Sequence, residues 1–68
     1  MTPKRNKLQQ TAYDVGVELG SYAAKHYGSL GVFRQTSEYG VTRQRFEDLD
    51  KAGEAFSDGV ESGWAGAK

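Results

Sequence analysis

The stretch Ala12-Tyr-Asp-Val-Gly-Val-Glu-Leu-Gly-Ser-Tyr-Ala-Ala-Lys25 recurs 43 residues later as Ala55-Phe-Ser-Asp-Gly-Val-Glu-Ser-Gly-Trp-Ala-Gly-Ala-Lys68. Seven of the fourteen positions are identical in the two copies. The shared small residues recur at every fourth position, a spacing that aligns them along one side of a helix. They are Ala12, Gly16, Gly20 and Ala24 in the first copy and Ala55, Gly59, Gly63 and Ala67 in the second. These two strips predict two helices that approach each other closely, within one protomer or across a homodimer.

Glycine inside a helix has a thermodynamic consequence that supports this prediction. Each such glycine costs about 1 kcal/mol relative to alanine, so five of them cost roughly 4–5 kcal/mol. Gly16 and Gly20 fall in the first predicted helix, and Gly53, Gly59 and Gly63 fall in the second. The sum is comparable with the whole stability of a small domain. Contact between the backbones along the two strips is the evident compensation.

Length and composition restrict the class of protein. A chain of 68 residues makes one domain, close to the lower size limit for folding alone. It contains no cysteine, so disulfides and thiolate metal sites are excluded. The formal net charge is zero, which argues against bulk electrostatic attraction to nucleic acid or to a membrane. No apolar run is long enough to span a bilayer and no signal-peptide pattern is present, so we expect a cytoplasmic protein.

The chain pattern predicts a small all-α protein of three helices. Residues 1–7 read as a flexible basic arm, followed by a single helical domain over residues 8–68. The first long helix begins at Leu8, and Gly28 is expected to end it in the left-handed conformation. Ser29 is expected to cap a short helix over residues 30–39, although Val32 and Phe33 also fit the start of an extended segment.

A second long helix is predicted over residues 43–64. Gly40 is expected to form the turn before it, and Thr42 is expected to cap it. Its apolar residues, including Phe46, Leu49 and Phe56, are three or four positions apart. Because the connection between the two long helices is short, we expect them to be antiparallel.

Residues 39–49, Tyr-Gly-Val-Thr-Arg-Gln-Arg-Phe-Glu-Asp-Leu, combine a glycine turn with a polar helix start and an apolar helix face. Together with their flanks, over about residues 32–51, they resemble the helix-turn-helix motif of DNA-binding proteins. The resemblance implies a regulator of transcription or an accessory protein of the kind that phages and plasmids encode. Arg43 would then contact guanine and Gln44 adenine. The candidate DNA-binding residues are Lys4, Arg5, Lys7, Thr42, Arg43, Gln44, Arg45 and Lys51.

Acidic residues favour a second hypothesis. Glu47, Asp48 and Asp50 follow the proposed base-reading residues, where phosphates would repel them. The alternative is a protein–protein interaction module, such as an inhibitor or adaptor encoded by a phage or mobile element, that docks on a host protein. The candidate interface residues are Glu47, Asp48, Asp50, Glu54, Asp58 and Trp64. The sequence leaves the DNA-binding and protein-binding hypotheses open.

Catalytic patterns are missing from the sequence. His26 is the sole histidine and has no nearby carboxylate in the chain, and Ser29 and Ser37 have no base within sequence reach. No group of residues has metal-ligand spacing, and the glycine-rich stretches lack the lysine of a phosphate loop. We therefore expect a protein that is not an enzyme and has no metal, cofactor or small-molecule substrate.

Overall fold

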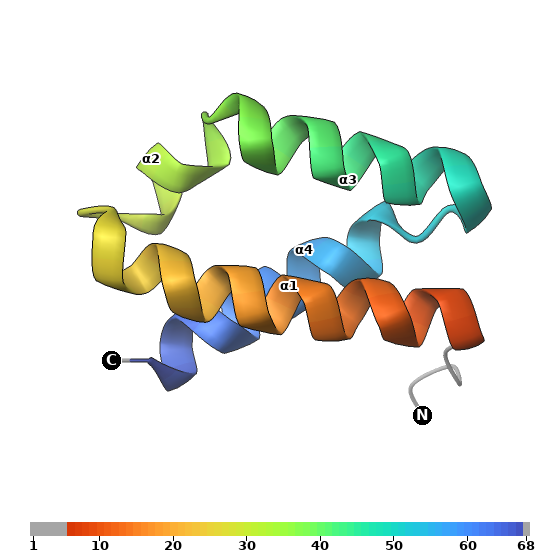
Figure 1. Ribbon diagram of the computed structural model, residues 1–68, viewed down its shortest axis with the longest axis horizontal. Coiled ribbons are helices and arrows are strands. Elements are labelled where there is room, and N and C mark those ends of the chain that lie inside the picture. The colour runs from red at the N-terminus through yellow and green to blue at the C-terminus, as the bar shows by residue number, and fades with distance from the viewer. Residues whose placement is uncertain (1–5, 68) are drawn as a thin grey trace.

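The computed structural model describes residues 6–67. In this range the chain is all-α and forms four helices: α1 (Lys7–His26), α2 (Leu30–Arg34), α3 (Ser37–Asp50) and α4 (Gly53–Gly66). Figure 1 shows α3 above α1 in the view, with α4 crossing behind α1. Within the described residues, no helix combines the length and the apolarity that are needed to cross a bilayer.

The start of α1 and the start of α2 follow from local capping. The Asn6 side chain accepts a hydrogen bond from the Gln9 amide at 2.7 Å, and the Gln9 side chain accepts one from the Asn6 amide at 3.2 Å. This reciprocal pair is a capping box. Ser29 caps α2 as predicted, accepting from the Val32 amide at 3.2 Å. The left-handed turn predicted at Gly28 is wrong, because Tyr27 ends α1 in an extended conformation and Gly28 has no positive φ.

The predicted corner at Gly40 is wrong. Helix α3 already begins at Ser37 and continues unbroken through Gly40 and Thr42. Its N-cap is Thr36, whose hydroxyl accepts a hydrogen bond from the Tyr39 amide at 3.3 Å. Glycine permits a turn but does not require one, so the strong cap three residues upstream decides where the helix begins. Residues 30–41 therefore contain two helices and no extended segment apart from the cap.

The second long helix is also divided, so the prediction of three helices is wrong. Lys51 ends α3 in the left-handed conformation, with φ of 52°. Its amide donates to the Glu47 carbonyl at 2.9 Å, and the Ala52 amide donates to the Phe46 carbonyl at 3.0 Å. The apolar spacing continues across this break, and lysine is an uncommon left-handed residue. The sequence therefore contained no clear signal for it.

Helices α1 and α4 pack backbone to backbone. A Cβ atom on Gly16 would overlap the carbonyl oxygen of Phe56 and lie 2.9 Å from the amide nitrogen of Val60. A Cβ atom on Gly20 would overlap the carbonyl oxygen of Val60 and lie 2.9 Å from its Cα. Only a hydrogen atom fits in the side-chain position at these two residues. The strip of α1 thus lies directly against the backbone of α4.

The contacts are reciprocal. A Cβ atom on Gly59 would overlap the Tyr13 carbonyl oxygen, and one on Gly63 would overlap the Val17 carbonyl oxygen. From Gly59 to Gly63 on α4, the contacted residue on α1 also advances by four positions, from Tyr13 to Val17. The two helices are therefore parallel. Gly16 contacts Phe56, and Gly59, which corresponds to Gly16 in the second copy, contacts Tyr13, which corresponds to Phe56. Because the contacts are equivalent in both directions, the duplicated segments are related by an approximate two-fold axis between them.

The antiparallel arrangement predicted from the sequence is therefore wrong. Helix α3 runs back along α1, and the left-handed residue Lys51 reverses the chain once more before α4 begins (Figure 1). This additional reversal restores the direction of α1. The two copies can then meet as equivalent parallel helices.

A chain of aromatic rings forms the core between the α1–α4 pair and the other two helices. The ring centroids of Tyr27 and Phe33 are 5.3 Å apart, and those of Phe33 and Tyr39 are 5.5 Å apart. Phe56 continues the chain at 5.6 Å from Tyr39 and 5.7 Å from Phe46. These distances are typical of favourable aromatic pairs. The rings hold α2 and α3 onto the pair formed by α1 and α4.

A candidate protein-binding groove

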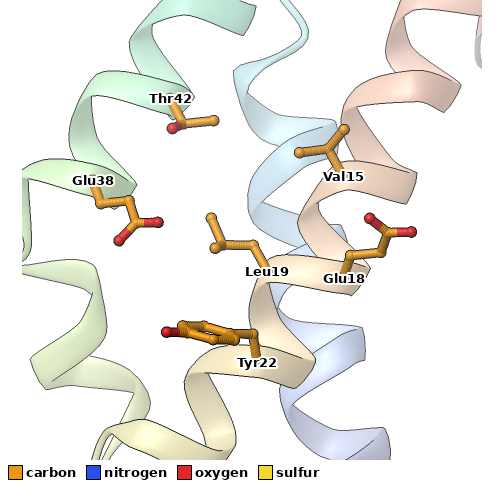
Figure 2. Close-up of a pocket in the computed structure, with 6 residues that line it drawn as sticks. All are labelled: Val15, Glu18, Leu19, Tyr22, Glu38 and Thr42. Carbon is orange, nitrogen blue, oxygen red and sulfur yellow. The ribbon is translucent and has the colours of Figure 1, made fainter.

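An open groove of about 360 Å³ lies between α1 and α3. Helix α4 occupies the small-residue side of α1, so the larger apolar side chains of α1 face toward α3 instead. Figure 2 shows Val15, Leu19 and Tyr22 pointing from α1 toward α3. The residues that line the groove are Val15, Glu18, Leu19, Tyr22, Glu38 and Thr42.

The α1 wall of the groove is apolar and incompletely covered. Val15 and Leu19 are partly buried and pack against the core. Tyr22 is 55% exposed, and its ring contacts that of His26 at a centroid distance of 4.2 Å. Spacings of four and three residues place the three apolar side chains on one side of the helix. An apolar row of this kind, open to solvent and rimmed by polar groups, is typical of an interaction surface.

Acidic side chains rim the groove. Glu18 lies on the α1 side and Glu38 on the α3 side, and both are exposed. In Figure 2 the Glu38 carboxylate points from α3 into the groove. Neither carboxylate has an ion-pair partner among residues 6–67. The ion pair found in this range joins Arg34 to Glu61. Among the described residues, the lining of the groove thus includes two carboxylates and no lysine or arginine.

The predicted DNA-binding residues are dispersed. Thr42 is half-buried in the wall of the groove, inside α3 and not at its start, so its amide is not free for a phosphate. The Gln44 side chain donates to the Asp48 carboxylate at 2.8 Å. Lys7 is exposed at the start of α1, Arg43 and Arg45 are exposed in the middle of α3, and Lys51 is exposed at its end. Lys4 and Arg5 lie outside the described residues.

The residues predicted for a protein interface lie in three kinds of environment. Asp48, Asp50, Glu54 and Asp58 are exposed, and Asp50 accepts a hydrogen bond from the Asn6 side chain. Glu47 is half-buried beside Gly53. Trp64 is only 6% exposed and belongs to the core, so its predicted role as an exposed anchor is wrong. Trp64 directly follows Gly63, where the backbone of α4 lies against that of α1.

The small residues predicted for packing or dimer contacts lie inside the chain. Ala12 and the four glycines of the two strips are buried, and Ala24 and Ala55 are partly buried beside them. Since the strips cover each other, they present no free face to a second copy of the chain.

The groove is not among the sites predicted from the sequence. Val15, Leu19 and Tyr22 lie four and three positions apart, a spacing that indicates a helix face packed on another helix but does not say which one. The available signal was that the first helix has two apolar faces, one of small residues and one of larger ones, and a single partner helix covers only one. Comparisons of the chain with protein-family models, with curated proteins and with solved structures gave no match.

Proposed function

We propose that the chain is a non-enzymatic protein-binding module that docks on a partner protein through the groove between α1 and α3. The observation that carries this proposal is the open apolar row of Val15, Leu19 and Tyr22 on a helix whose opposite side is already covered by α4. This function corresponds to an adaptor or inhibitor of another protein.

The scaffold supports this role because the apolar row is held in place before any partner arrives. Backbone contacts at Gly16 and Gly20 fix α1 against α4 along the same stretch that carries the row. A wall that is already ordered loses little conformational entropy on binding. The groove is also open rather than enclosed, and none of the polar side chains that line it is fully buried. Small-molecule sites are usually concave and contain a few buried polar groups, so a protein surface is the better fit.

DNA binding is the second candidate, supported by the exposed Arg43 and Arg45 on α3. These two arginines could contact phosphates without a helix-turn-helix motif. The acidic residues Glu47, Asp48 and Asp50 in the same helix weigh against it, since they would repel the same phosphates.

Site-specific photo-crosslinking tests the protein-binding proposal. A benzophenone amino acid replaces Tyr22 in the groove or, as the matched control, Val32 on α2, whose exposed fraction of 53% is close to the 55% of Tyr22. We expect a discrete covalent adduct with a partner protein in cells that naturally express the chain when the probe is at position 22, and none at position 32. Equal adducts at the two positions, or none at either, would contradict the proposal.

A salt titration with fluorescently labelled mixed-sequence duplex DNA tests the second candidate. We expect no anisotropy change at low salt. Binding that weakens steeply with added salt, and that disappears when both Arg43 and Arg45 are changed to alanine, would instead support DNA binding through phosphate contacts.

A further inference from the structure

We propose that the segment bound in the groove is an amphipathic helix of the partner with lysine or arginine on both sides of its apolar face. This inference depends on the proposed function, and it adds the conformation and the charge of the bound segment.

The shape of the groove favours a helix. Its walls are two antiparallel helices, and a third helix laid between them packs its ridges against theirs (Figure 1). The α1 wall presents apolar residues at positions 15, 19 and 22, the spacing that contacts a matching apolar stripe on another helix. A peptide that binds by adding a strand would need a free strand edge for its backbone hydrogen bonds, and residues 6–67 contain no strand.

The charge of the groove favours a basic partner. Each wall contributes one carboxylate, Glu18 from α1 and Glu38 from α3, and neither has an ion-pair partner among the described residues. A helix lying between them would bring one of its sides close to the Glu38 carboxylate, which points into the groove (Figure 2). Its other side would lie along α1, where a long basic side chain can extend to the exposed Glu18 carboxylate at the rim. Cations at these positions are attracted, whereas acidic residues are repelled from both walls.

A pair of synthetic helical peptides tests the inference. Both peptides have the 14-residue length of α3 and the same leucine stripe, and their flanking positions carry either lysine or glutamate. Binding is followed by amide chemical shifts of isotope-labelled protein. We expect the lysine peptide to bind at least about tenfold more tightly than the glutamate peptide, because two favourable charge pairs replace two repulsive ones. The chemical-shift changes should be centred on Leu19, Tyr22 and Thr42.

Charge reversal supplies the matched control. The double variant Glu18→Lys and Glu38→Lys should prefer the glutamate peptide. The double variant Glu54→Lys and Asp58→Lys makes the same change in net charge at exposed positions of α4 and should still prefer the lysine peptide. Circular dichroism melting of both variants verifies that each is folded.

The outcomes separate this inference from the proposed function. Equal binding of the two peptides, or a preference that both double variants reverse alike, would overturn the basic-helix inference. Binding of neither peptide, together with a discrete adduct from the probe at position 22, would also overturn it and leave the protein-binding function standing. No peptide binding and no adduct would remove both.

Discussion

Two glycines of this chain show that the role of a residue is decided by what lies beside it. Gly20 sits in α1 against the backbone of Val60, where a side chain has no room. Gly40 sits in the exposed interior of α3, and nothing lies within 4 Å of the position its Cβ would take. Both are helical residues without positive φ. Alanine improves the helix propensity at each position, but at Gly20 it also pushes two helices apart.

We therefore expect opposite effects of the same substitution. Gly40→Ala should stabilise the protein by about 0.5–1 kcal/mol, the intrinsic advantage of alanine over glycine in a helix. Gly20→Ala should destabilise it by about 1–3 kcal/mol, as is usual for overpacking. Urea unfolding followed by circular dichroism measures both changes in the free energy of unfolding. A stabilised Gly20→Ala variant would show that α1 and α4 are not in backbone contact there.

At the scale of the secondary-structure elements, the start of α3 decides whether the chain contains a helix-turn-helix corner. Thr36 caps α3, since its hydroxyl accepts from the Tyr39 amide and donates to the Phe33 carbonyl at 2.7 Å. Thr42, which would be the cap if the turn were at Gly40, is one turn inside the helix. Only one of these threonines can therefore satisfy the free amides at the start of a helix.

Alanine at each threonine distinguishes the two helix starts. Thr36→Ala should lower the free energy of unfolding by about 1 kcal/mol, the usual effect of losing an N-cap. Thr42→Ala should change it by less than about 0.5 kcal/mol, because alanine is a better helix former than threonine. Thermal and urea unfolding of the two variants give the comparison. A larger loss at Thr42 than at Thr36 would place the helix start, and with it the DNA-binding corner, at Gly40.

At the scale of the whole molecule, the fold is a parallel pair of related helices, α1 and α4, with α2 and α3 packed on it through the aromatic core. The described chain measures 32 Å along its longest axis. This length separates the two ends of the helix pair. In the parallel arrangement the end of α1 lies near the end of α4, whereas in an antiparallel arrangement it would lie near the start of α4.

Paramagnetic labelling can measure this arrangement. The chain has no cysteine, so Lys25→Cys gives one nitroxide site at the end of α1. We expect the label to broaden the amide signals of residues 63–67 more than those of residues 53–56. The control label, at Lys7→Cys, lies at the start of α1 next to Asn6, which bonds to Asp50, and should show the reverse order. Broadening near residues 53–56 from the label at position 25 would contradict the parallel pair.

The sequence by itself determined the class of the fold and its closest contact. Helical spacing predicted an all-α chain, and Ser29 marked the start of α2. The two glycine strips indicated a close helix pair because their energetic cost requires a close contact in return. These features are local, or repeat at a regular period, and can therefore be recognised without coordinates.

Only the tertiary structure decided the direction of the pair, the break at Lys51 and the groove. The break at Lys51 is stabilised by aromatic packing, because it lets Phe56 contact the rings of Tyr39 and Phe46. Such contacts join residues far apart in the chain and override local preference. The groove has the same origin, because Val15, Leu19 and Tyr22 stay open only as a consequence of α4 taking the other side of α1. Which of its two apolar faces a helix buries depends on the position of the neighbouring helices. The spacing of apolar residues in the sequence does not show that position.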